Sequence, residues 1–121
     1  MILYAAADLL WATRIKATGE KVGTPCRPVR SLEMLELRLK DEPVRAVLLD
    51  LETDELAFAI MDRLRGDRAS DPERAITLIA WGPHVLVDQL AEARARGCDR
   101  VLTRGQFANG LAELLVQLHA A

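Results

Sequence analysis

One short run of apolar residues that ends in a carboxylate constrains this chain more than any other stretch. Residues 46–49 are Ala, Val, Leu and Leu, and Asp50 follows them directly. An uninterrupted apolar run of this length is typical of a strand buried on both faces. Such strands belong to parallel sheets, whose ligand sites lie beyond the carboxyl ends of the strands. The sequence therefore places Asp50 where an α/β protein performs its chemistry.

The same alternation of an apolar run with an amphipathic segment recurs along the chain. Strands are predicted at 2–7, 45–51, 75–81 and 99–103, and 21–29 is either an edge strand or a partly extended segment because Pro25 and Pro28 interrupt it. Helical spacing predicts helices from Asp8 to Gly19, from Ser31 to about 42, from Thr53 or Asp54 to 64, from His84 to 96, and over 107–118. A polar loop is expected at 66–74. Parallel strands need helical crossovers, so we predict a three-layer α/β/α sandwich around a five-stranded parallel sheet.

Composition favours one domain over residues 1–121, with half of the residues hydrophobic and a net charge of −2. The chain has no excess of basic residues that would attract nucleic acid. No apolar stretch reaches the roughly 20 residues that a membrane-spanning helix needs. The start has no basic region of a signal peptide, so a cytoplasmic protein is expected. Cys26 and Cys98 lie far apart in sequence, and two unpaired thiols are the favoured interpretation over a disulfide or metal site.

The order of elements and two motifs resemble the receiver domains of response regulators, which have a flavodoxin-like fold with strand order 2-1-3-4-5. The first motif is residues 47–51, similar to the strand that carries the phosphoacceptor aspartate of that family. The second is residues 95–104, similar to the segment that leads through the fifth strand to a lysine. The resemblance covers the whole chain, and it implies that Asp50 occupies the phosphoacceptor position.

The chain departs from the rest of the pattern that this resemblance implies. Receivers carry two carboxylates after strand one to bind Mg²⁺, and the matching residues here are Ala6 and Ala7, with an acid only at Asp8. The family's Ser or Thr after strand four falls near Trp81 or Gly82, and neither has a hydroxyl. The family's lysine before a proline becomes Arg104 before a glycine, whose peptide bond we expect to be trans.

These departures predict a stand-alone pseudo-receiver, a non-catalytic protein-interaction and signalling module without a bound Mg²⁺. Mg²⁺ requires oxygen ligands that two alanines do not supply, and phosphoryl transfer depends on such charge neutralisation. Asp50 is then a remnant, held by Arg104 or by a helix N-terminus, and Asp8 is a helix cap. Two alternatives remain open: a working receiver phosphorylated on Asp50, and a small-molecule binder using the cleft of Asp8, Asp50, Trp81, His84 and Arg104.

Trp81, with Trp11 expected near it, stands where the family has a small hydroxyl residue. Its ring either fills the space around that position or presents an exposed aromatic anchor to a partner. Receivers often pair through the face of the fourth helix, fifth strand and fifth helix. Mixed charge on that face suits a self-complementary homodimer, whereas a merely solvated face is the alternative. The charged residues proposed for this interaction face are Arg94, Arg96, Asp99, Arg100 and Glu113.

Overall fold

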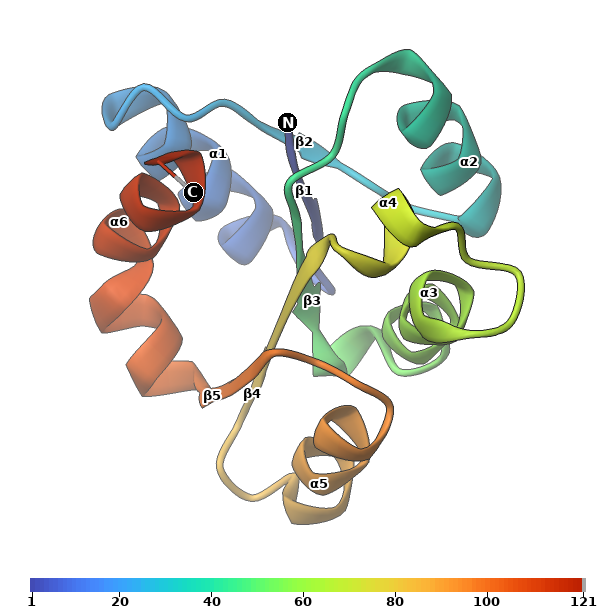
Figure 1. The fold of residues 1–121 in the computed structure, drawn as a ribbon. Helices are drawn as coiled ribbons and strands as arrows, with labels where there is room; N and C mark the ends of the chain where they lie inside the picture. The colour runs from blue at the N-terminus through green and yellow to red at the C-terminus, as the bar shows by residue number, and fades with distance from the viewer. Residues whose placement is uncertain (121) are drawn as a thin grey trace.

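The architecture, seen in a computed structural model that describes residues 1–120, is a five-stranded parallel sheet between two layers of helices (Figure 1). The strand order is β2-β1-β3-β4-β5, as predicted. Every neighbouring pair is parallel, and Asp50 at the end of β3 lies beside Trp81 of β4. The strands are β1 (Ile2–Ala5), β2 (Cys26–Pro28), β3 (Ala46–Asp50), β4 (Thr77–Gly82) and β5 (Arg100–Thr103).

The helices divide between the two faces of the sheet, and each face has its own apolar core. Helices α1 and α6 cover one face, where Ile15, Phe107 and Leu115 pack on alternate residues of β1, β3 and β4. Helices α2, α3 and α5 cover the other face through Leu35, Ile60 and similar residues. The helices are α1 (Leu9–Lys21), α2 (Leu32–Asp41), the single-turn 3-10 helix η1 (Leu51–Thr53), α3 (Glu55–Arg65), α4 (Asp71–Arg74), α5 (Val87–Ala95) and α6 (Arg104–Ala120).

The prediction that Gly19 ends the first helix is wrong, because α1 continues to Lys21. Gly19 is buried inside the helix, and a Cβ there would lie 2.5 Å from the Thr24 carbonyl oxygen. The absence of a side chain at Gly19 therefore lets α1 pack closely on the segment that leads into β2. The left-handed residue that reverses the chain is Gly23, with φ of 75°.

Three further boundaries differ from the sequence prediction. The polar loop at 66–74 contains α4, whose Ser70 and Glu73 form a reciprocal capping box with a proline in its first turn. The predicted helix from His84 begins only at Val87, so His84 lies in the preceding turn. The last helix begins at Arg104, earlier than the apolar spacing indicated.

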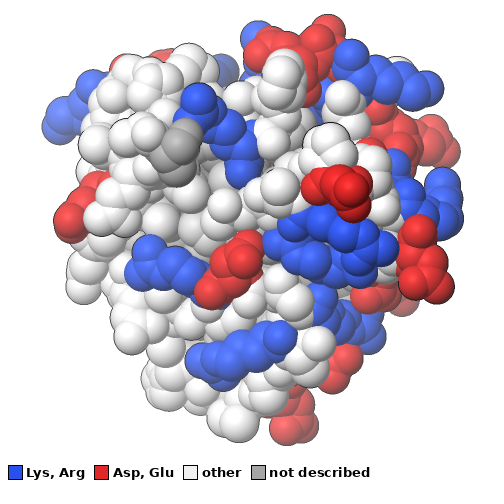
Figure 2. All heavy atoms as spheres, in the orientation of Figure 1, with Lys and Arg blue, Asp and Glu red and all other residues white. Residues whose placement is uncertain are grey.

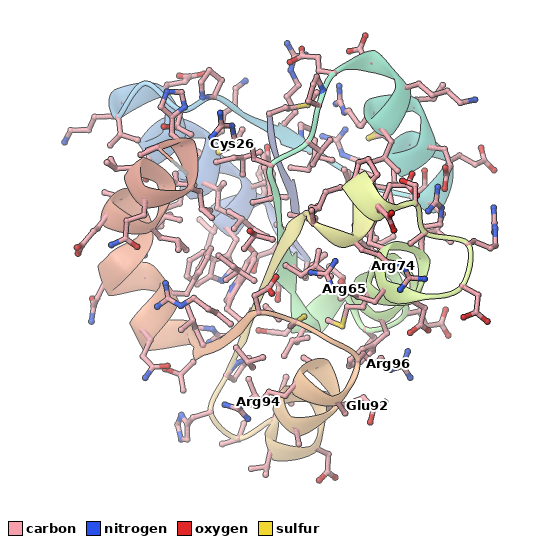
Figure 3. The ribbon with its side chains drawn as sticks, viewed as in Figure 1. Cys26, Arg65, Arg74, Glu92, Arg94 and Arg96 are labelled. Carbon is pink, nitrogen blue, oxygen red and sulfur yellow. The ribbon has the colours of Figure 1, made fainter. Side chains whose placement is uncertain are left out.

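Ion pairs tie the helical layer on the α3 side together. The Arg63 guanidinium, with a side chain 13% exposed, binds both carboxylate oxygens of Glu36 on α2 and of Glu73 on α4. Arg65 donates to the carbonyls of Ile76 and Gly97, and Figure 3 shows it beside α3, where the strands β4 and β5 begin. These arginines join segments that the sheet does not connect.

Charge of both signs is interspersed on the face of the molecule that Figure 2 shows. Among residues 1–120, no helix is long and apolar enough to cross a membrane. The two cysteines are free, with Cys26 buried and Cys98 half-buried, as predicted. Burial raises the pKa of each thiol to about 11.

Candidate functional site

Asp50 lies at the carboxyl end of β3, at the rim that the sequence indicated. Its side chain bridges two loops: Oδ2 accepts the Ala7 amide at 2.9 Å, and Oδ1 accepts the Glu52 amide at 2.9 Å. The residue is 1% exposed. Asp50 is thus the cap of η1 and, through Ala7, a link to the end of β1. The prediction that a helix N-terminus holds this carboxylate is confirmed.

Burial determines the charge behaviour of Asp50. Desolvation raises the pKa of the Asp50 carboxyl, and the Ala7 and Glu52 amide hydrogen bonds only partly oppose it. The Glu52 and Asp8 carboxylates raise the pKa further. Among residues 1–120, no cationic side chain is one of the causes of this shift.

The residues that follow β1 supply little for a cation beside Asp50. Ala6 is half-buried and Ala7 exposed, and neither carries an oxygen ligand on its side chain. Asp8 caps α1 as predicted, because its Oδ1 accepts the Trp11 amide at 2.9 Å. Within residues 1–120 there is no group of three or more His, Cys, Asp or Glu side chains that could hold a metal. The side chains of Ala6 and Ala7 thus supply none of the oxygen ligands that the resemblance implied at these two positions.

Trp81 fills the α1–α6 side of the sheet next to Asp50. It is 1% exposed, its ring stacks on Phe107 at 4.0 Å between centroids, and Trp11 contacts both rings edge-on or tilted. The alternative of Trp81 as an exposed aromatic anchor is therefore wrong. Its indole Nε1 is buried without a hydrogen-bond partner, which costs free energy that the aromatic packing must offset.

Gly82 ends β4 in direct contact with η1. A Cβ at this position would lie 3.3 Å from the Leu51 Cβ, so even a small side chain requires Leu51 to move. Neither position 81 nor position 82 presents a hydroxyl to Asp50. The Ser or Thr that the resemblance implied has no structural equivalent at these two residues.

Arg104 does not hold Asp50, contrary to one of the two predicted possibilities. Its guanidinium forms a close ion pair with Glu52, while both oxygens of Asp50 already have backbone partners. The chain contains no cis peptide bond among the described residues, so the bond after Arg104 is trans as expected. Arg104 still ties the end of β5 to η1, although through the neighbouring carboxylate.

Sequence reasoning missed why α6 begins at Arg104. Thr103 and Gln106 cap the helix reciprocally: the Thr103 amide donates to Gln106 Oε1 at 2.9 Å, and the Gln106 amide donates to Thr103 Oγ1 at 3.3 Å. The signal was present, because Thr-x-x-Gln before an apolar helix is a capping-box pattern. The partners of Asp50 were not recoverable in this way, since they are backbone amides.

Four of the five residues proposed for the interaction face separate into two groups. Arg96 pairs with Asp62 and lies 4.7 Å over the Phe58 ring, so it contacts α3, and Asp99 pairs with Arg65 and accepts the Leu78 amide. Figure 3 shows Arg94 on α5 and Arg96 at the end of that helix. Arg100 and Glu113 line a cavity of about 340 Å³ between β5 and α6. The interaction role of these residues stays a prediction.

Comparison with solved structures places this architecture among receiver domains. The receiver domain of a DNA-binding response regulator from Colwellia psychrerythraea is similar with a TM-score of 0.77 and 18% identity, over 99% of this chain and 98% of the other. The receiver domain of a histidine kinase from Syntrophus aciditrophicus gives 0.79 and 19%, over 98% and 89%. The receiver domain of NtrX from Brucella abortus gives 0.78 and 14%, over 98% and 97%.

Comparison of the sequence with known proteins finds less than comparison of the structure. No family model matches the chain, and no curated protein sequence matches it. The fold is thus the flavodoxin-like fold of response-regulator receiver domains, which confirms the predicted architecture. At these identities the similarity establishes the fold alone, and the site must be judged from its own residues.

Proposed function

We propose that this chain is a signalling module of the pseudo-receiver type, which acts by binding proteins and does not accept phosphate on Asp50. The observation that supports this most directly is that both oxygens of the buried Asp50 accept backbone hydrogen bonds. An attacking carboxylate oxygen must reach a phosphoryl group that is held in line and neutralised by cations. Each oxygen keeps a further lone pair, but Asp50 is 1% exposed, so a phosphoryl group can approach it only if the surrounding loops move.

The surroundings of Asp50 support the same proposal. Ala6 and Ala7 provide no metal ligands, and the guanidinium of Arg104 is engaged by Glu52. Losing one donor that stabilises developing charge commonly lowers a rate by about 100- to 1000-fold. Loss of the carboxylate pair, the hydroxyl and the free cation together leaves Asp50 as a structural residue in a protein without catalytic activity.

A titration with Mg²⁺ and beryllofluoride, followed by tryptophan fluorescence, tests this proposal. Trp81 is the neighbour of Asp50 in the sheet and Trp11 contacts it, so a ligand on Asp50 must alter the emission. We expect no saturable change at millimolar concentrations. The double variant Ala6→Asp/Ala7→Asp is the matched positive control, and we expect it to gain measurable Mg²⁺ affinity.

The two alternatives have distinct outcomes in the same experiment. A working receiver would saturate with beryllofluoride and would incorporate phosphate from acetyl phosphate, an increase in mass that Asp50→Asn abolishes. A small-molecule site would show stabilisation by a metabolite in a thermal-shift screen, about 2.7 kcal/mol at 100 times the dissociation constant. The burial of Asp50 and Trp81, each 1% exposed, argues against an open cleft that contains both side chains.

A homodimer is a second candidate, and the cavity between β5 and α6 favours it. Its lining combines Leu102, Phe107 and Leu114 with the opposite charges of Arg100 and Glu113. A two-fold axis there would bring each arginine toward the glutamate of the other copy. Sedimentation equilibrium should then show a dimer that Arg100→Glu weakens and that the added change Glu113→Arg restores. A monomer at high concentration would exclude this interface.

A further inference from the structure

A groove along the edge of the sheet, between α1 and β2, combines apolar and cationic side chains in its lining. Its volume is about 550 Å³, and its lining includes Tyr4, Ala12, Pro25 and Pro28. Leu9 at the start of α1 borders it and is 81% exposed, although an apolar side chain of this size is usually covered. We refer to it as the α1–β2 groove.

Four cationic side chains and a single acid accompany these apolar residues. Lys16, Arg27, Arg30 and Arg38 line the groove together with Glu20. The whole chain carries a net charge of −2, so the groove has a charge opposite to that of the protein. Within residues 1–120, no ion pair involves Lys16, Arg27 or Arg30. These charges are available to an anionic partner.

Tyr4 contributes a polar atom to the lining of the groove. The residue is 95% buried and its ring belongs to the core under α1 and α6, yet no hydrogen bond involves its hydroxyl among the described residues. Burial raises the pKa of Tyr4, and the charges of Arg30 and Arg38 lower it, which places both guanidinium groups near the hydroxyl. The hydroxyl is not among the fully buried, unpartnered polar atoms of residues 1–120, so it reaches the surface of the groove, where an oxygen of a ligand can replace water as its partner.

The shape of the groove limits the kind of ligand. Small-molecule sites enclose most of the ligand surface, whereas Leu9, Lys16, Arg27 and Arg30 are all exposed along this one. Addition of a strand to β2 is also unfavourable, since Pro25 and Pro28 have no N–H to donate. An extended segment recognised by its side chains fits both restrictions.

We propose that the α1–β2 groove binds an acidic segment of a partner protein, whose apolar side chains rest on Ala12 and the prolines. Carboxylates of the segment pair with Lys16, Arg27 and Arg30, and the Tyr4 hydroxyl donates to one of its oxygens. Arg38 is already positioned at this edge, because its guanidinium donates to the Pro28 carbonyl at 3.2 Å. The proposal rests on the proposed function only in that the chain acts by binding proteins.

A fluorescent peptide in which leucine and glutamate alternate is the probe for this site. We expect saturable binding to the intact chain, with shifts of the Tyr4, Ala12 and Arg30 amide resonances in ¹⁵N spectra. Peptides that alternate leucine with lysine, or serine with glutamate, should not saturate. Binding should weaken as salt is raised, because the paired charges are exposed. A failed peptide titration would overturn the groove proposal but would leave the beryllofluoride result unaffected.

Matched variants separate a built site from general attraction of acidic peptides. Arg30→Glu should weaken binding at least about tenfold, which corresponds to about 1.4 kcal/mol. Arg68→Glu makes the same change of charge at an exposed residue outside the groove and should change affinity by less than about twofold. Tyr4→Phe keeps the ring and should weaken binding several-fold through loss of the hydroxyl alone.

Three results would overturn the proposal. The first is equal affinity of the wild type and Arg30→Glu, and the second is a set of shifted amides that excludes α1 and β2. The third is displacement of the peptide by single-stranded DNA or inorganic phosphate at comparable concentrations. The last result would assign the basic rim to phosphate groups and not to an acidic protein segment.

Discussion

Replacement of Asp50 by alanine tests whether this residue is a structural link between two loops. The side chain accepts two hydrogen bonds of 2.9 Å, from the amides of Ala7 and Glu52. An amide left without a partner costs about 1–3 kcal/mol, so two would cost about 2–6 kcal/mol. Ala7 is exposed, and water can reach its amide. The loss of stability should therefore be about 3 kcal/mol for Asp50→Ala.

The variant Asp50→Asn distinguishes hydrogen bonding from charge. The carboxamide keeps one acceptor oxygen, but its NH₂ group faces one of the two amide donors. We expect a loss of about 1–2 kcal/mol, between the wild type and Asp50→Ala. Desolvation of the carboxylate opposes these losses, because burial raises the pKa of Asp50 and makes its charged form less favourable in the folded chain.

Urea unfolding followed by circular dichroism measures these differences. With a slope of about 1–3 kcal/mol per molar urea, a loss of 3 kcal/mol moves the midpoint by about 1–3 M. Asp67→Ala removes an exposed carboxylate in the loop before α4 and should leave the midpoint almost unchanged. An Asp50→Ala variant that equals or exceeds the wild type in stability would show that the carboxylate is a strained functional group and would refute the structural interpretation.

Three further predictions concern other parts of the fold. The guanidinium of Arg63 holds the pKa of Glu73 at about 2, so the stability that this pair contributes above pH 4.5 should be lost as the pH drops toward 2. Urea titrations at acid pH should show that Arg63→Met flattens this dependence. Asp54 has φ of 49°, and its side chain makes no capping hydrogen bond to α3. Because glycine adopts positive φ without strain, Asp54→Gly should raise the free energy of unfolding by about 1 kcal/mol, whereas Asp54→Asn should not, as unfolding midpoints would show. Gly19→Ala should cost about 2–3 kcal/mol because its Cβ meets a carbonyl oxygen at 2.5 Å, while Gly110→Ala, with open space in α6, should gain about 1 kcal/mol in thermal unfolding.

The parallel strands and the place of Asp50 were predictable from patterns that the sequence displays directly, whereas the strand order was implied by the resemblance to receiver domains. A continuous apolar run indicates a buried parallel strand, and the end of such a strand defines the rim of the sheet. The caps by Asp8 and Ser31 were also visible, since the residue type alone indicates the hydrogen bond. Local chemistry of this kind is encoded within a few residues.

The contacts at the site were harder to predict because they join segments distant in sequence. Nothing local shows that Asp50 binds the Ala7 amide, or that Arg104 selects Glu52 over Asp50. The prediction for Gly19 failed for the same reason. The Thr24 carbonyl oxygen occupies the space that a Cβ at position 19 would need, and the two residues meet only in the folded chain. Helix propensity indicated a stop, and tertiary packing determined the outcome.

The stacked indole of Trp81 also limits how this protein can evolve. A small hydroxyl residue at that position would remove the stacked ring, and trimming a buried aromatic side chain costs about 3–5 kcal/mol. Domains of this size are stable by only about 5–15 kcal/mol. A variant with a small side chain at position 81 would therefore lose a large part of this stability. The packing of Trp81 on Phe107 makes position 81 one of the least replaceable positions at this edge of the sheet.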